Sequence, residues 1–176
     1  MKEKILKIIK LPIIYILIFC VFAQAKLYET VPEYIMTPDS YSYHEVYNKS
    51  IFKGEIDDFR TPGYPYFIKI IEKFSNENNL YNNVVLVQKI LFLITVVLVY
   101  LTMMKITKNK IIASFVSIIV GICPYLVLFN VLILTETLGV FSVVLLIYVT
   151  SLYICNPRKI TAAITGAIIF FMIMTR

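Results

Sequence analysis

The sequence predicts an all-α integral membrane protein with about five transmembrane helices and two short amphipathic helices in a long first outer loop. Of its 176 residues, 59% are hydrophobic and 16% are charged, whereas a typical soluble domain has roughly 45–50% and about 25%. The apolar residues form long uncharged runs with Lys and Arg beside them. Because basic residues in these places set membrane orientation, the net charge of +6 does not indicate nucleic acid as a partner.

Five apolar runs are candidates for the transmembrane helices. A helix needs about 20 apolar residues to cross the hydrocarbon layer, and about 17 are tolerated. The three middle runs satisfy this length, whereas the first and last do so only with neighbouring residues. The second run contains one charge, Lys89, which is typical of a snorkelling lysine at the outer interface. The predicted spans cover residues 11–27, 84–104, 111–129, 136–155 and 160–176, and the outer loop covers 28–83.

Charge asymmetry predicts the orientation of these spans. The N-terminus carries four lysines, residues 105–110 carry three, and Arg158 and Lys159 follow the fourth span. Residues 26–83 instead contain nine acids against six basic residues. Because short positive segments face the cytoplasm, we expect a cytoplasmic N-terminus and an extracytoplasmic loop 28–83, in a bacterial plasma membrane.

A second interpretation makes the first run a cleaved secretory signal. Lysines, an apolar stretch and Ala23-Gln-Ala25 fit that pattern. It is less favoured because Lys26-Leu-Tyr28 follows without a loose polar spacer, and it would leave the four later spans unchanged. No disulfide is expected, because the outer loop contains no cysteine.

The outer loop predicts two short helices on the membrane surface. Thr37 can cap the first, Pro38 can occupy its first position, and Asp39 suits the positive helix end. Before the second helix, Pro62-Gly63 suits a type II turn and Pro65 can open the helix. The apolar faces are Tyr43, Val46, Tyr47 and Ile51 in the first helix, and Phe67, Ile70, Ile71 and Phe74 in the second.

This loop resembles the first outer loop of GT-C glycosyltransferases, polytopic enzymes that take a sugar from a polyprenyl-phosphate carrier. They include protein O-mannosyltransferase and lipid A aminoarabinose transferase relatives. Two later segments are also similar to the family: Ile133-Leu-Thr-Glu-Thr137 to the acidic position of its second outer loop, and Met174-Thr-Arg176 to its Thr-Arg at a span end. In the first loop the matching residues are Asp39, Tyr43, Gly54, Arg60, Pro62, Gly63, Tyr64 and Pro65.

The resemblance implies sugar transfer from a polyprenyl-phosphate donor to a lipid or cell-envelope acceptor on the extracytoplasmic face. The chain departs from the family in length, because relatives usually have several further spans. We therefore expect the N-terminal part of such an enzyme (a fragment, a frameshifted product or a minimal relative) with little or no activity in isolation. The DNA downstream of the Arg176 codon would distinguish these cases.

Two interpretations from other classes stay open. One is a non-catalytic polytopic membrane subunit or scaffold with the same loop architecture. The other is a small transporter, which is less favoured because the polar residues gather at the outer boundary rather than at the middle of the membrane.

The resemblance implies that Asp39 and Glu136 are catalytic. Asp39 would bind or deprotonate the acceptor hydroxyl, and such a carboxylate contributes about 10²–10⁴-fold to the rate. The alternative for Asp39 is helix-end stabilisation. Glu136 interrupts a long uncharged stretch, and an ionisable residue at membrane depth indicates function; its alternative is an interfacial turn.

Arg60 and Arg176 are the candidates for the donor phosphate, because a guanidinium offers paired donors to phosphate. The alternative for Arg60 is an ion pair with Asp57 or Asp58. Each of the two arginines belongs to a segment that carries the resemblance.

Tyr43 and Tyr64 are the remaining substrate candidates, since a tyrosine ring can stack on a sugar, although tyrosine is also ordinary at membrane interfaces. No cofactor is assigned. The lone His44 is weak evidence for a metal, so a divalent cation would have to use Asp39 and Glu136.

Overall fold

A computed structural model describes residues 2–47 and 60–175 of the chain. These residues form helices and their connections, and the only β-pairing among them is an isolated bridge between Ile35 and Leu132. The predicted all-helical class is therefore confirmed. The helices are α1 (Lys2–Tyr28), α2 (Pro38–Tyr47), α3 (Gly63–Glu72), α4 (Leu80–Thr107), α5 (Lys110–Ile122), α6 (Pro124–Phe129), α7 (Glu136–Cys155) and α8 (Lys159–Thr175), with a 3₁₀ turn at Glu77–Asn79.

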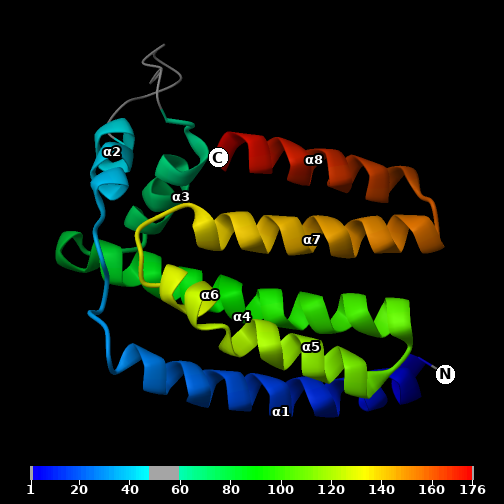
Figure 1. Cartoon of the computed structure of the whole chain (residues 1–176). Helices are drawn as coiled ribbons and strands as arrows, with labels where there is room; N and C mark the ends of the chain where they lie inside the picture. The colour runs from blue at the N-terminus through cyan, green and yellow to red at the C-terminus, as the bar shows by residue number, and fades with distance from the viewer. Residues whose placement is uncertain (1, 48–59, 176) are drawn as a thin grey trace.

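The long helices lie side by side, and their ends separate two kinds of connection (Figure 1). At one end lie α2, α3 and residues 130–135, which connect α6 to α7; we call this the loop end. At the other end lie the N-terminus and the short connections at 108–109 and 156–158; we call this the link end. The fold therefore places the acidic loop and the basic connections at opposite ends, and which end faces the cytoplasm stays a prediction.

Two helices, α4 and α7, are long and apolar enough to cross a membrane, judged by length and composition. The apolar helices of residues 12–28, α5 and α8 are shorter. Five spans therefore stay a prediction, with two helices meeting the full length criterion.

The predicted third span, residues 111–129, consists of two helices. Cys123 has φ −60° and ψ 115°, an extended conformation between α5 and α6. The cause is Pro124, because a proline disfavours helical geometry in the residue before it and is itself well suited to a first helical position. The same residue was available in the sequence as a signal for this break.

The predicted start of α2 is confirmed in its details. The Thr37 hydroxyl accepts a hydrogen bond from the Ser40 N–H at 3.3 Å, and the Ser40 hydroxyl accepts one from the Thr37 N–H at 2.9 Å. This reciprocal pair satisfies two helix-end donors, while Pro38 occupies the first helical position. The buried side of α2 includes Tyr43 and Val46, as predicted, whereas Ile51 lies outside the described residues.

Helix α3 begins earlier than predicted. It starts at Gly63, and Pro62 has φ −78° and ψ −13°, which is helical and rules out the predicted type II turn. A close approach explains the glycine: a Cβ on Gly63 would lie 2.4 Å from the Met174 carbonyl oxygen of α8. The start of α3 therefore packs directly on the end of α8.

The buried face of α3 also differs from the predicted stripe. Tyr64, Ile68 and Ile71 are buried, whereas Ile70 and Phe74 are exposed. With the helix starting at Gly63, positions 64, 68 and 71 share one face because they are spaced i, i+4 and i+7. Sequence periodicity had predicted that the neighbouring face, which includes Ile70 and Phe74, would be the buried one.

Two hydrophobic clusters form the core. At the loop end, one cluster packs α2 and α3 against α4, the start of α7 and the connection between α6 and α7. Nearer the middle, the other joins α1, α4, α5 and α6. The buried members of the first cluster are Tyr43, Tyr64, Ile68, Ile71, Val84, Val85, Val131, Ile133 and Leu138.

Close packing of α1 on α5 depends on Gly121. A Cβ at this position would lie 2.4 Å from the sulfur of Cys20. The approach also lets the buried Gln24 amide of α1 donate a hydrogen bond to the Gly121 carbonyl at 2.8 Å. This bond lies outside the loop-end cluster, which contains neither Gln24 nor Gly121.

Candidate functional site

Asp39 and Arg60 form an ion pair at the loop end. Arg60 donates from Nη2 to Asp39 Oδ1 at 2.5 Å and from Nε to the Ser42 hydroxyl at 2.8 Å. The Asp39 side chain is 60% exposed and that of Arg60 is 21% exposed. The carboxylate therefore stays accessible while the guanidinium is largely covered. The alternative pairing with Asp57 or Asp58 lies outside the described residues.

Two tyrosines connect this pair to the core. The guanidinium carbon of Arg60 lies 4.9 Å from the Tyr43 ring centroid, a cation–π contact. Tyr43 in turn meets Tyr64 edge-on, with 5.1 Å between ring centroids. Both tyrosines are buried, Tyr64 completely. Both rings therefore pack in the loop-end cluster, and their contact with a sugar stays a prediction.

Gln88 of α4 is the polar centre beneath these rings. The Tyr64 hydroxyl donates to Gln88 Oε1 at 2.8 Å, and Gln88 Nε2 donates to the carbonyls of Asn130 and Leu132 at 3.0 and 2.9 Å. The Gln88 side chain is completely buried. A buried amide is stable only when it is hydrogen-bonded, and here three bonds meet that demand.

Asn130 extends the network to two further helices. Its Nδ2 donates to the Tyr28 hydroxyl of α1 at 3.2 Å, and its Oδ1 accepts from the Thr137 hydroxyl of α7 at 3.2 Å. Lys89 lies over the Tyr28 ring, 4.0 Å from its centroid. The connection between α6 and α7 is therefore hydrogen-bonded to side chains of α1, α4 and α7.

The segment between α1 and α2 also binds this connection through its backbone. The Ile35 N–H donates to the Val131 carbonyl at 2.8 Å, and the Ile133 N–H donates to the Ile35 carbonyl at 3.1 Å. The Ser40 hydroxyl donates to the Ile133 carbonyl at 2.9 Å. These bonds attach the segment before Asp39 to the segment before Glu136, so the two predicted acidic sites belong to one assembly.

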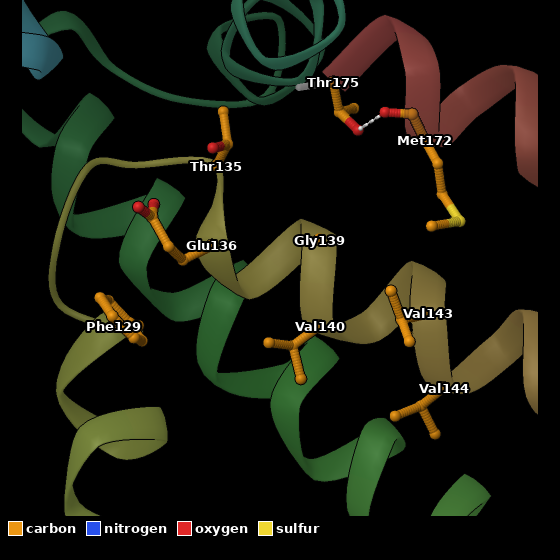
Figure 2. Close-up of a pocket in the computed structure, with 9 residues that line it drawn as sticks. All are labelled: Phe129, Thr135, Glu136, Gly139, Val140, Val143, Val144, Met172 and Thr175. Atoms are coloured by element: carbon orange, nitrogen blue, oxygen red, sulfur yellow. Dashed lines mark hydrogen bonds between the residues drawn. The ribbon is translucent and has the colours of Figure 1, made fainter.

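Glu136 begins α7 and lines a cavity of about 320 Å³ between α7 and α8 (Figure 2). One of its carboxylate oxygens is buried and has no hydrogen-bond partner among the described residues. Apart from the polar groups near Glu136, the walls are mostly aliphatic. The lining residues are Phe129, Thr135, Glu136, Gly139, Val140, Val143, Val144, Met172 and Thr175.

Tyr64 is under the electrostatic influence of Glu136. Burial raises the pKa of Tyr64 well above its ordinary value of 10.0, and Tyr43, the Glu136 carboxylate and Tyr81 add to the rise. The phenol is therefore protonated at neutral pH and remains the donor to Gln88. Asp39 is connected to Tyr64 by contacts through Arg60 and Tyr43, whereas the negative charge of Glu136 raises the pKa of Tyr64.

A divalent cation held by Asp39 and Glu136 stays a prediction. Among the residues that the structure describes, no group of three or more His, Cys, Asp or Glu side chains gathers. Asp39 already pairs with a guanidinium, whose positive charge opposes a cation beside it. Arg176, the second predicted phosphate ligand, lies outside the described residues, although its neighbour Thr175 lines the cavity.

Sequence reasoning missed Ser42, Gln88 and Asn130 as parts of this assembly. Gln88 carried a signal, because it is an amide inside the second predicted apolar run and buried polar groups in such helices are expensive unless paired. Asn130 carried the same kind of signal, because it is an amide in the uncharged stretch from Ile111 to Thr135. Ser42 carried none, since it is a serine in a polar loop.

The sequence model of the family described as dolichyl-phosphate-mannose-protein mannosyltransferase matches residues 5–173. Comparisons with curated proteins and with solved structures give no significant match. The matched range includes Asp39, Arg60 and Glu136, and it agrees with the resemblance found in the first outer loop. With nearly its whole length matched, the chain belongs to the dolichyl-phosphate-mannose-protein mannosyltransferase family of membrane glycosyltransferases.

Proposed function

We propose that this chain carries part of the site that transfers a sugar from a polyprenyl-phosphate donor to an acceptor hydroxyl on the extracytoplasmic face of the membrane. Asp39 is the base, and Glu136 is a second carboxylate of the same site. The observation that carries the proposal is the exposed Asp39 carboxylate, held by a covered arginine on the assembly that leads to Glu136.

In the proposed reaction the acceptor oxygen attacks the anomeric carbon of the donor sugar. The acceptor proton passes to the Asp39 carboxylate, the bond between the anomeric carbon and the phosphate oxygen breaks, and polyprenyl phosphate leaves. Such a base must lie within hydrogen-bond reach of the hydroxyl. The 60% exposure of the Asp39 side chain supports this role, because a substrate can approach it.

Arg60 has a positioning role in this proposal. Its bonds to Asp39 and Ser42 and its contact with Tyr43 restrict where the carboxylate lies. These contacts favour orientation of Asp39 over the predicted capture of the donor phosphate. Arg60→Lys distinguishes the two roles: loss of orientation lowers kcat, whereas loss of phosphate binding raises the KM for the donor.

The cavity beside Glu136 suits an apolar segment of a substrate. Its volume of about 320 Å³ lies at the lower end of ligand pockets, which measure about 300–1,000 Å³. Aliphatic walls from α7 and α8 suit a hydrocarbon, and the carboxylate at the loop end suits a hydroxyl attached to it. A lipid carrier or a lipid acceptor shares this chemistry.

The proposal is tested with Asp39→Asn in membranes that contain the longest reading frame including residues 1–176. A labelled polyprenyl-phosphate sugar is the donor, and transfer to the acceptor fraction is measured. Turnover should fall by about 10²-fold or more, because the base is lost while size is kept. The KM for the donor should change little.

Glu29→Gln is the matched control, because Glu29 also forms an ion pair at the loop end, 3.1 Å from Lys26, and is exposed. Its turnover should equal that of the wild type. If Asp39→Asn keeps wild-type turnover at equal expression, Asp39 only stabilises the start of α2, and the interpretation as a non-catalytic subunit or scaffold is favoured.

A further inference from the structure

We infer that Gln88 is a positioning residue, which holds the segment before Glu136 at a set distance from the Asp39–Arg60 pair. The consequence for turnover rests on the function proposed above. The geometric part of the inference does not, since it concerns only how the two outer segments are held together.

The hydrogen bonds of Gln88 use both halves of its amide. Oε1 accepts from Tyr64 of α3, and the two N–H groups of Nε2 serve the carbonyls of Asn130 and Leu132. Because the side chain is completely buried in α4, water cannot replace a lost partner. Any movement of residues 130–132 away from α4 would therefore leave donors unpaired.

The carbonyls of residues 130–133 alternate in their partners, and this alternation explains how Gln88 fixes the position of the connection between α6 and α7. Asn130 and Val131 form the turn that ends α6, and the four carbonyls from residue 130 to residue 133 bind two different partners in alternation. The carbonyls of Asn130 and Leu132 bind Gln88, whereas those of Val131 and Ile133 bind the segment 35–40. Residues 130–133 are thus clamped between α4 on one side and Ile35 and Ser40 on the other.

The clamp connects the two acidic residues by short paths. On one side, α7 begins with Glu136 soon after the clamped residues. On the other, Tyr64 contacts Tyr43, which lies under Arg60, the partner of Asp39. Gln88 itself is inaccessible to a substrate, so it acts through these residues.

Gln24 offers a matched control. It is also a buried glutamine in a long helix, and its Nε2 donates to a backbone carbonyl, that of Gly121, at 2.8 Å. Its bond joins α1 to α5 and involves no residue of the segment 130–133. A general cost of losing a buried amide should appear in Gln24→Leu and Gln88→Leu alike.

The geometric test is disulfide cross-linking in the full chain in membranes. Ile35 and Leu132 are paired in the isolated bridge, so Ile35→Cys and Leu132→Cys together should cross-link readily under mild oxidation. Adding Gln88→Leu should slow cross-linking by about tenfold, because disulfides require a narrow range of distances. Adding Gln24→Leu should leave the cross-linking rate unchanged. Mass spectrometry of the linked peptides distinguishes the engineered disulfide from disulfides that involve the natural cysteines.

The kinetic test compares the same variants, without the added cysteines, in the transfer assay. Gln88→Leu should lower kcat by about tenfold or more with little change in the donor KM, the pattern of a lost transition-state arrangement. Tyr64→Phe removes one bond and keeps both carbonyl bonds, so it should lower kcat less. The double variant should be no worse than Gln88→Leu alone.

Equal cross-linking rates in the Gln88 and Gln24 variants would overturn the inference and leave Gln88 as ordinary packing. Slower cross-linking in Gln88→Leu, but not in Gln24→Leu, supports the inference. Absence of sugar transfer in every variant would reject the proposed function and leave the positioning of the connection by Gln88 in place. If the leucine variant does not accumulate in membranes, Gln88→Asn, which is one methylene shorter, is used with the same expected result.

Discussion

The loop end and the link end of this protein are held together in different ways. At the loop end, side-chain bonds join residues far apart in the sequence, such as Tyr28 with Asn130 and Ser40 with Ile133. At the link end, the described side chains bond within their own turn. Thr107 donates to the Met103 carbonyl, and Asn109 accepts from the N–H groups of Ile111 and Ile112.

This difference shows where precise geometry is required. A local cap satisfies backbone groups at the terminus of one helix and contributes little to the positions of distant segments. A long-range network of buried polar groups costs desolvation and is favourable only when every member is paired. The protein maintains such a network beside Asp39 and Glu136, where the proposed chemistry needs a defined arrangement.

The largest expected effect concerns orientation. Asn79 and Asn109 are both exposed asparagines, and they directly precede α4 at the loop end and α5 at the link end. In a Cys155→Ser background, Asn79→Cys should react with an impermeant maleimide from outside intact cells, whereas Asn109→Cys should react only after permeabilisation. Labelling of position 109 in intact cells would reverse the orientation and remove the catalytic assignment.

Glu136→Gln should separate activity from stability. Turnover should fall by about 10²-fold if the carboxylate takes part in the reaction. The melting temperature should stay equal or rise, because one carboxylate oxygen is buried without a described partner and a neutral amide costs less to bury. Thermal unfolding and transfer are measured on the same preparation; a fall in both would indicate a structural role instead.

Gly63→Ala should weaken the loop end. The added Cβ would lie 2.4 Å from the Met174 carbonyl oxygen, which is backbone and cannot rotate away. Overpacking of this kind typically costs about 1–3 kcal/mol, and denaturant unfolding in detergent measures it. Gly166→Ala is the control, because a Cβ there meets nothing within 4 Å; equal destabilisation of both variants would refute the α3–α8 contact.

The smallest effect is expected at the link end. Asn109→Ala removes the side chain that accepts from Ile111 and Ile112 at the start of α5. The cost should be about 1 kcal/mol of stability, the usual value for a lost helix cap. Turnover should not change, since the loss stays within one turn. A fall in activity would mean that the two ends are more strongly coupled than their hydrogen bonds indicate.

Local patterns were reliable where the physics is local. The cap formed by Thr37, the helical position of Pro38, and the burial of Tyr43 and Val46 all follow from neighbouring residues and are present in the structure. The break before Pro124 was equally local but was hidden by an uninterrupted apolar run. In α3, periodicity predicted an amphipathic helix, yet the start at Gly63 changed which face is buried.

The sequence by itself determined the helical class, the separation of acidic and basic connections, and the identity of the acidic candidates. Only the tertiary structure decided that Arg60 pairs with Asp39, that Tyr64 is buried rather than exposed, and that Gln88 binds both α3 and the connection between α6 and α7. The physical reason is distance along the chain. Composition and periodicity report the environment that a residue prefers, whereas its partner depends on which remote segment packs against it.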